Sequence, residues 1–234
     1  MENADSITID GRTIPIAIKR SGRARRISLR ISPARDGIII TLPRRASIAA
    51  GLKFFHSKAD WVLANITAQS RVMLAEGNII PIMGKDYAIK CLPGRGTARL
   101  VEQEDGINIL EIHCAPEFLA RRTKDFLKKL MHSHCLIRCQ EQAKILGKTV
   151  TRLTLTQAQS RWGSCNGKGA ITLNWLLVFA PPNVLEYLIA HEVAHLGEMN
   201  HSPRFWKLVE QLMPDMKAAR KWLKEHGHML HRYG

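Results

Sequence analysis

The run His191-Glu192-Val193-Ala194-His195 constrains this chain more than any other feature of its sequence. On a helix, residues i and i+4 lie one above the other on the same face, so the imidazoles of His191 and His195 can bind one metal ion. Zinc binds histidine nitrogens readily and lowers the pKa of a bound water toward neutrality. Glu192 lies on the same turn, where its carboxylate can accept a proton from that water. The run therefore predicts a helix that carries a zinc site and a general base.

The flanking residues favour the same helix. Pro181 and Pro182 suit its first turn, and Asn183 with Glu186 could form a variant of the capping box. Gly197 is typical of a residue just past a helix end. We therefore expect a helix that is buried on one side and has both histidines in its second half.

A third histidine follows at a predicted corner of the chain. His201 precedes Ser202 and Pro203, which suit the N-cap and first position of a new helix. A histidine at such a corner between two helices can turn back toward the metal. We predict that His201 is the third ligand.

The spacing of the three histidines supports this prediction. Counted from His191, they stand at relative positions 1, 5 and 11, a spacing that resembles the metzincin zinc proteases. Glu198 takes the place of the glycine in that motif, and Gly197 comes one position early, so the turn must differ in detail. Glu210 or Glu225 could supply a carboxylate as the third ligand instead.

Several segments of the C-terminal half resemble a known family more specifically than the two histidines alone. They are Arg161-Trp162-Gly163-Ser164-Cys165, Ile171-Thr172-Leu173-Asn174-Trp175, His191–His195 and Glu198–Trp206. The chain resembles the YgjP-like metallopeptidases, bacterial relatives of the SprT-like and WLM zinc-peptidase domains. The similarity is dense over about residues 155–225 and extends to Arg26–Ile31 and Met83–Tyr87.

This resemblance implies an HExxH zincin core with one zinc ion per chain. It implies the ligands His191, His195 and His201, with Glu192 as the catalytic base. Some bacterial members of the family have been assigned as nucleoside-triphosphate pyrophosphatases that act on UTP. The resemblance therefore allows either a polypeptide or a nucleotide substrate.

The segment Gln157–Trp175 predicts two antiparallel strands joined by the turn Asn166–Gly169. A strand edge beside the metal helix could bind an extended peptide by backbone pairing. Arg161 could stabilise an oxyanion or a phosphate near the zinc, or it could form a buried structural salt bridge. Asn174 could orient one of the metal ligands.

The charge of the chain is strongly positive and unevenly distributed. The 234 residues include 35 lysines and arginines against 20 acids, a net charge of +15, and ten of the cations lie between Arg12 and Arg45 with one acid. In the segment Arg26–Ile31, apolar and polar residues alternate as on a half-buried strand. Its arginines form either a solvated face or a surface for nucleic acid or nucleotide phosphates.

The order of predicted elements indicates an α+β fold. A β-rich region of residues 1–115, with one helix from about Ser47 to Arg71, precedes a zincin-like catalytic domain of residues 116–234. The strands expected in the first region are Ile14–Lys19, Arg26–Ile31, Gly37–Leu42, Ile79–Ile82, Tyr87–Lys90, Ala98–Glu102 and Ile107–Ile112. A long helix to about Gly147, a strand at Leu153–Thr156, the hairpin and three helices are expected in the second.

Composition argues against a membrane or secreted protein. No apolar run reaches spanning length, and the first residues are polar and acidic, unlike a signal peptide. Five cysteines without a CxxC pair argue against a disulfide framework, so we expect a cytoplasmic protein.

The sequence thus predicts a zinc-dependent hydrolase, and peptide hydrolysis is the first hypothesis. Hydrolysis of nucleoside triphosphates such as UTP is the alternative within the resembled family, although the chain has no P-loop. A third hypothesis is a nucleic-acid-associated protein whose metal site is structural or cleaves proteins bound to nucleic acid.

Overall fold

A computed structural model describes residues 6–9, 12–32, 37–59, 62 and 72–234. The chain divides into two compact units, Met1–Arg71 and Val72–Gly234. Each combines a β-sheet with helices, so the α+β fold class is confirmed. The division falls well before residue 115, where the sequence pattern predicted it. The reason is that Ile80, Ile89 and Leu110 of the second sheet share one hydrophobic core with the helices that follow.

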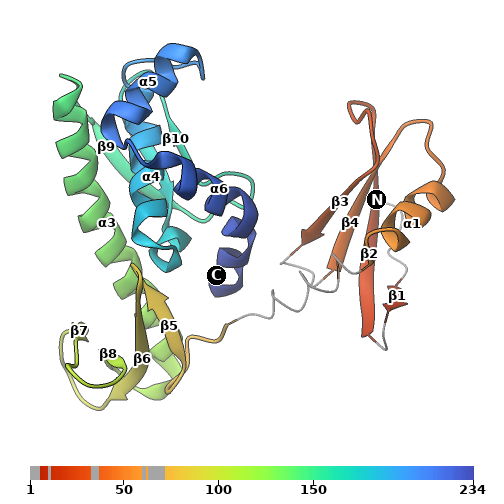
Figure 1. Ribbon diagram of the computed structural model, residues 1–234. Helices are drawn as coiled ribbons and strands as arrows, with labels where there is room; N and C mark the ends of the chain where they lie inside the picture. The colour runs from red at the N-terminus through yellow and green to blue at the C-terminus, as the bar shows by residue number, and fades with distance from the viewer. Residues whose placement is uncertain (1–5, 10–11, 33–36, 60–61, 63–71) are drawn as a thin grey trace. The chain divides into compact units, whose positions relative to one another are not determined.

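The first unit is a four-stranded sheet with one described helix (Figure 1). The strands β1 and β2 are antiparallel, β2 and β4 are parallel, and β3 pairs antiparallel with β4 in the order β1-β2-β4-β3. Ile38, Ile40 and Leu42 alternate along β4 as its buried residues, as the period of two requires. The elements are β1 (Ser6–Ile9), β2 (Arg12–Ser21), β3 (Ser28–Ser32), β4 (Gly37–Pro43) and α1 (Ile48–His56).

Helix α1 begins where the sequence predicts and packs on the sheet. The Ser47 side chain accepts a hydrogen bond from the backbone N–H of Ala50, which makes Ser47 the N-cap. Gly51 lies so close to Leu42 of β4 that a Cβ on it would come within 2.7 Å of the Leu42 side chain. The helix ends at His56, and most of the remaining length expected up to Arg71 lies outside the described residues.

The second unit opens with a sheet of the same topology. Its order is β5-β6-β8-β7, again with a central parallel pair and two antiparallel outer strands. Each of these two sheets therefore consists of two antiparallel strand pairs, and a parallel pairing between the inner strands joins them. The bounds are β5 (Ile79–Ile82), β6 (Lys85–Leu92), β7 (Arg99–Val101) and β8 (Asn108–His113).

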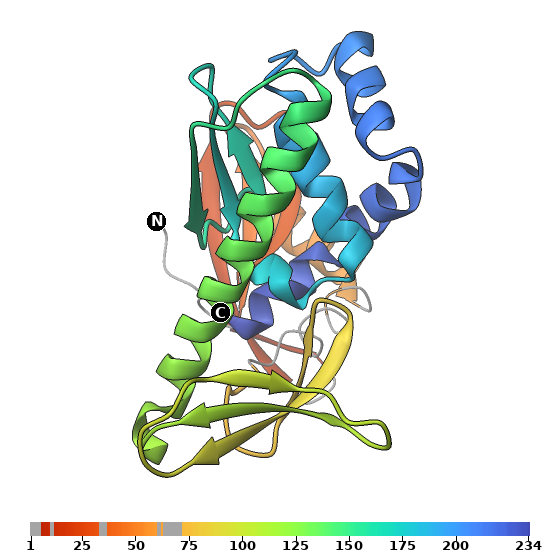
Figure 2. The ribbon, with the colours of Figure 1, turned by 90° about the vertical axis from the view of Figure 1, so that its left-hand side faces the viewer.

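A long helix, α3 (Leu119–Ile145), connects this sheet to the rest of the second unit. Figures 1 and 2 show α3 in green, with its first turns beside β8 and its later turns beside α4 and β9. A three-stranded sheet follows in the order β10-β11-β9, and its hairpin β10–β11 has the predicted turn. The remaining elements are η2 (Pro116–Phe118), β9 (Arg152–Thr156), β10 (Gly163–Cys165), β11 (Ala170–Asn174), η3 (Trp175–Phe179), α4 (Pro182–Ala194), α5 (Pro203–Leu212), α6 (Met216–His226) and η4 (Gly227–Tyr233).

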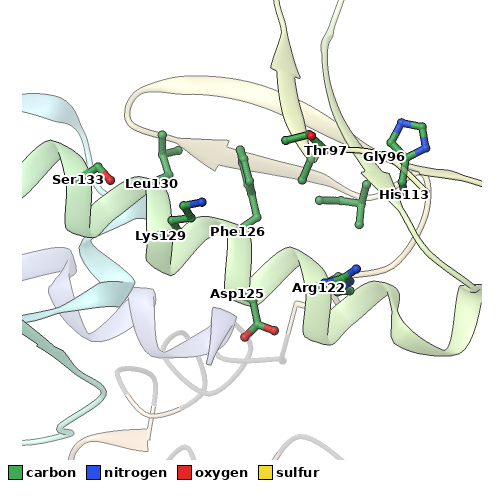
Figure 3. A pocket seen from close by; sticks show the side chains of 11 residues that line it. Gly96, Thr97, His113, Arg122, Asp125, Phe126, Lys129, Leu130 and Ser133 are labelled. Atoms are coloured by element: carbon green, nitrogen blue, oxygen red, sulfur yellow. The ribbon is translucent and has the colours of Figure 1, made fainter. Parts of the chain in front are cut away.

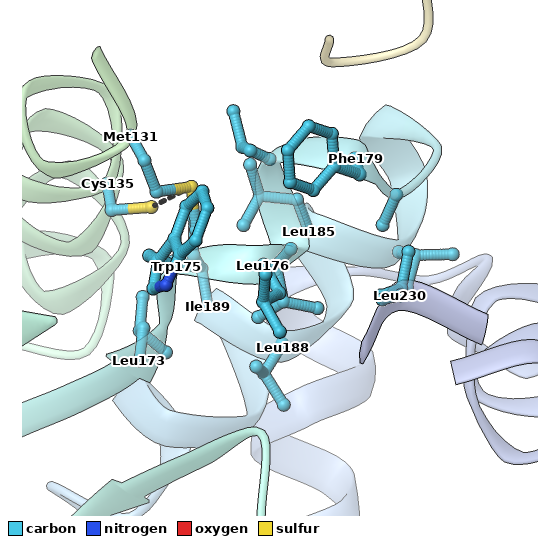
Figure 4. Packing of buried hydrophobic residues seen from close by; sticks show 14 of the residues in the cluster. Met131, Cys135, Leu173, Trp175, Leu176, Phe179, Leu185, Leu188, Ile189 and Leu230 are labelled. Carbon is cyan, nitrogen blue, oxygen red and sulfur yellow. Dashed lines mark hydrogen bonds between the residues drawn. The ribbon is translucent and has the colours of Figure 1, made fainter. Parts of the chain in front are cut away.

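The core of the second unit centres on η3 and α4 (Figure 4). Trp175 is completely buried and lies near Met131 and Cys135 of α3, while Leu185 and Ile189 of α4 face the same cluster. The Cys135 thiol donates to the Met131 sulfur at 3.6 Å, so this cysteine is part of the packing. Among the described residues, no helix is long and apolar enough to cross a membrane.

The turn between β5 and β6 packs against the start of α4. Met83 and Gly84 have positive φ angles of 47° and 86°, and the Met83 N–H donates to the carbonyl of Val178 at 2.8 Å. A Cβ on Gly84 would lie 2.6 Å from Cδ of Pro182, in the first turn of α4. This contact fixes one end of α4 against the first sheet of the unit.

We predict that Gly84→Ala lowers the free energy of unfolding by about 2–4 kcal/mol, because it adds left-handed strain and a steric overlap with Pro182. Gly77→Ala is the matched control, because Gly77 has a φ of 80° but open space around its Cβ position. This control should lose only about 1–2 kcal/mol. Urea unfolding of both variants checks the difference, and equal losses would contradict the packing role of Gly84.

Candidate metal centre

The structure brings the three predicted histidines together at the C-terminal end of α4. His191 lies in the last turn of α4, His195 is its C-cap, and His201 lies in the loop before α5. One ligand atom from each lies within 4.8 Å of the others, and the Nε2 atoms of His191 and His201 are 3.1 Å apart. The side chains of Glu210 and Glu225 do not belong to this group.

Local hydrogen bonds explain how the chain turns back after α4. The Glu198 N–H donates to the Ala194 carbonyl at 3.0 Å, which closes a turn directly after the helix. The Glu198 carbonyl lies 3.1 Å from Nδ1 of His195, so Nε2 of His195 is the nitrogen left for a metal. Ser202 then caps α5 by accepting from the Phe205 N–H, as the sequence predicted. His201 thus lies between the hydrogen-bonded turn at Glu198 and the N-cap of α5 at Ser202.

The environment of His191 and His195 favours their neutral form. Burial, together with the charges of His195, His201 and Arg220, lowers the pKa of His191 to about 4. Burial also lowers the pKa of His195. A neutral imidazole has a lone pair for a metal, whereas a protonated ring has none.

The donor set fits a zinc ion. Two nitrogens bound to tetrahedral zinc are roughly 3.3 Å apart at ordinary bond lengths, close to the 3.1 Å between His191 and His201. Three imidazole ligands would leave a fourth position for water or substrate, as in catalytic zinc sites. The residues present therefore match a catalytic rather than a closed structural site.

Glu192 is buried beside the histidines against an edge strand. Its side chain packs directly on Gly163 of β10, and a Cβ at that position would overlap the carboxylate. Glu192 is 3% exposed, and its Oε2 has no hydrogen-bond partner among the described residues. Burial raises the pKa of Glu192 to about 8, and the charge of Arg161 opposes this rise. The carboxylate therefore retains an unused acceptor at the centre of the site.

Arg161 lies in the loop before β10 and is exposed to solvent. Its charge acts on Glu192, so the loop holds the guanidinium within electrostatic range of the carboxylate. This position excludes the buried salt bridge that the sequence left open for Arg161.

Asn174 anchors that loop and contacts no histidine in the described hydrogen bonds. Its Nδ2 donates to the Ala158 carbonyl at 2.8 Å, and its backbone N–H donates to the Trp162 carbonyl at 2.7 Å. The prediction that Asn174 orients a metal ligand is therefore not supported by its hydrogen bonds; it positions the loop that carries Arg161.

The start of α4 differs from the predicted capping box. Pro181 is the N-cap, and no side chain caps the helix there. Glu186 instead pairs with Arg138 of α3 at 2.9 Å and lies 3.5 Å from His134. Glu186 thus forms an ion pair between α3 and α4 in place of the predicted capping interaction within α4.

Most of the chain matches a known protein family. The family described as YgjP-like, metallopeptidase domain, matches residues 25–226. This chain belongs to that family. The resemblance of its sequence motifs is thereby confirmed, and the chain is assigned to the metallopeptidases as a metal-dependent hydrolase.

One solved structure is similar to part of this chain. The crystal structure of the metallopeptidase zymogen of Pyrococcus abyssi abylysin is similar at 23% identity and a TM-score of 0.36. The similarity covers 42% of this chain and 97% of that chain. No curated protein matches the sequence.

Two residues near the three histidines were not predicted from the sequence: Trp206 of α5 and Arg220 of α6. The ring of Trp206 lies nearly parallel to that of His201, with centroids 6.0 Å apart, and the Arg220 guanidinium lies 4.2 Å above Trp206. Arg220 also lowers the pKa of His191. Trp206 belongs to a family motif and could have been proposed, but nothing in the local sequence of Arg220 indicates its position.

A separate cavity of about 430 Å³ lies between α3 and the end of β8 (Figure 3). Phe126 and Leu130 form its apolar side, with His113 and Arg122 at its rim. None of the three histidines of the metal centre lines it. This cavity is therefore not part of the metal centre.

We predict that purified protein carries about one zinc per chain and that His201→Ala weakens zinc binding far more than Glu210→Ala or Glu225→Ala. The reason is that only the histidine places a ligand atom beside those of α4. Metal analysis after dialysis against a graded zinc buffer measures the effect. Full zinc content in His201→Ala, with loss in a glutamate variant, would refute the ligand assignment.

Proposed function

We propose that this metallopeptidase-family protein is a zinc-dependent peptidase in which Glu192 is the general base and Arg161 stabilises developing negative charge. The observation that carries the proposal is the convergence of three histidine nitrogens next to the buried carboxylate of Glu192, the residue that follows His191. Zinc bound there would polarise a peptide carbonyl and make water a better nucleophile near neutral pH.

Glu192 is suited to move protons between the attacking water and the leaving nitrogen. Its Oε2 retains an unused acceptor, and burial raises the pKa of Glu192 toward the pH at which it must both accept and release a proton. Gly163 presses on the carboxylate from β10, so its direction is fixed by packing. In the proposed reaction Glu192 takes a proton from water and then delivers it to the amine that leaves.

The strand β10 supports peptide binding. It pairs with β11 on one side only and is thus an edge of the three-stranded sheet. Its other edge can pair with an extended polypeptide, which would pass beside Glu192. Arg161, in the loop just before this strand, would face the carbonyl oxygen as it gains negative charge.

The proposal is tested by incubating zinc-loaded protein with unfolded polypeptides and, in parallel, with nucleoside triphosphates including UTP. We expect new amino termini from the polypeptides, and a chelator should abolish them. Hydrolysis of the triphosphates without any peptide cleavage would overturn the peptidase proposal in favour of pyrophosphatase activity.

We predict that Glu192→Gln retains zinc and fold but lowers peptide hydrolysis by about 10²–10⁴-fold, because glutamine cannot accept the proton. Glu186→Gln is the matched control on the same helix. It loses the ion pair with Arg138 and the contact with His134, but Glu186 is not paired with His191, His195 or His201, so turnover per folded molecule should stay close to that of the wild type. Near-normal turnover in zinc-loaded Glu192→Gln would remove Glu192 from the mechanism.

We also propose that the first unit binds nucleic acid through a basic surface, defined here as Arg23, Arg25, Arg26 and Arg30. All four are exposed, and Arg30 lies on β3 at the edge of its sheet. Cations placed this close together repel one another, and phosphates of a polyanion would relieve that repulsion.

For this surface we predict that Arg26→Gln with Arg30→Gln weakens binding to RNA or DNA oligonucleotides and leaves zinc content unchanged. The slope of log affinity against log salt should become shallower by roughly one unit for each phosphate that the variant no longer neutralises. Lys53→Gln with Lys58→Gln removes the same charge from exposed positions at α1 and is the control. Equal effects of the two pairs, or no binding at low salt, would contradict a specific basic surface.

A further inference from the structure

A cavity of about 250 Å³ lies directly beside the metal centre, on the side of His195. Three chain segments form it: the residues after α3, the turn between β10 and β11, and the loop after α4. They contribute Lys148, Thr149, Asn166, Gly167, Lys168, Gly169, His195, Leu196, Gly197 and Met199. The cavity therefore adjoins a proposed metal ligand, unlike the larger cavity at α3.

Hydrogen bonds make two of these segments rigid. The Asn166 side-chain oxygen accepts from the backbone N–H groups of Lys168 and Ala170, both at 3.0 Å. The Thr151 hydroxyl donates to the Lys168 carbonyl at 2.8 Å, which ties the turn to the segment after α3. Gly169 has a φ of 78°, and a Cβ there would lie 3.0 Å from the Thr149 carbonyl oxygen. The walls are thus formed before a ligand arrives.

The charged side chains that line the cavity are all positive. Lys148 and Lys168 both line it and are exposed, whereas no aspartate or glutamate occurs among its lining residues. Met199 is 48% exposed and, with Leu196, supplies an apolar surface. This combination suits a short aliphatic stem that ends in an anion.

The edge strand connects the cavity to the site of hydrolysis. Gly163, at the start of β10, packs on Glu192, and Asn166 of the cavity comes three residues later. Three residues of extended chain span roughly 10 Å. A polypeptide paired with the free edge of β10 would therefore have a reacting carbonyl near Glu192 and a side chain a few residues away at the cavity.

We propose that this cavity binds the carboxylate of an aspartate or glutamate side chain of the polypeptide substrate and that Lys148 and Lys168 determine this specificity. The proposal rests on the peptidase function proposed above. A side-chain carboxylate is favoured over a nucleotide phosphate because the adjoining binding element is a strand edge, which recognises polypeptide backbone.

The test uses zinc-loaded full-length protein and quenched fluorescent peptides that are identical except at one position, which carries Glu, Gln or Lys. The variable residue is moved along the peptide, and kcat/KM is measured for each. We expect one position at which Glu is preferred over Gln, and Gln over Lys. Cleavage without such a position would overturn the acidic-side-chain proposal while leaving the peptidase function intact.

The lysines are tested by Lys148→Glu with Lys168→Glu. Reversing two charges near the bound side chain should shift the ratio of kcat/KM for the Glu and Lys peptides by on the order of tenfold or more toward Lys. Lys90→Glu with Arg95→Glu makes the same net change at exposed positions on and just after β6, in the other sheet of this unit, and should leave the ratio unchanged. An equal shift in both pairs would show that overall charge, not the cavity, sets the preference.

A failure of the peptidase function itself gives a different result. In that case no peptide in the set is cleaved, whatever residue stands at the variable position. Hydrolysis of nucleoside triphosphates that is lost in Lys148→Glu with Lys168→Glu would assign the cavity to phosphate and overturn the proposal.

Discussion

Helix α4 packs against α3, α5, α6 and the strand β10, and this packing determines the geometry of the candidate metal centre. Its apolar residues are buried on several sides, including Val184, Ile189 and Val193. Because protein interiors are close-packed, such a helix has little freedom to rotate or slide. His191 and Glu192 are consecutive on it, so one turn directs an imidazole to the ligand cluster and a carboxylate to Gly163.

The same packing places Glu192 in an environment that an isolated carboxylate would avoid. Removing a carboxylate from water disfavours its charged form, which is why burial raises the pKa of Glu192. The charge of Arg161 offsets part of this effect from the loop that Asn174 anchors. The hydrogen bonds of Asn174 therefore hold the loop from which Arg161 acts on the pKa of Glu192.

The two four-stranded sheets illustrate how packing, and not strand order, defines the units of the chain. Both have a central parallel pair flanked by antiparallel strands. The sheet β5-β6-β8-β7 joins the helices of the second unit because the turn at Gly84 packs on Pro182 and because its buried residues continue the core of those helices. The sequence boundary at residue 115 followed the change from strands to helices, which does not coincide with this core.

Local patterns in the sequence were sufficient to predict much of the fold and the centre of the candidate site. Apolar periodicity and turn residues indicate ten of the eleven described strands, all except β1, together with the long α3 and the helix α4, because these signals act between residues close in sequence. The spacing of His191 and His195 follows from helix geometry alone. The sequence also predicted His201 as the third ligand but left Glu210 and Glu225 open, and the tertiary structure places His201, not these glutamates, beside His191. Only the tertiary structure decided that Glu186 pairs with Arg138 and that Arg220 lies beside the histidines. These interactions join residues distant in sequence, and their geometry depends on how whole elements pack rather than on any local preference.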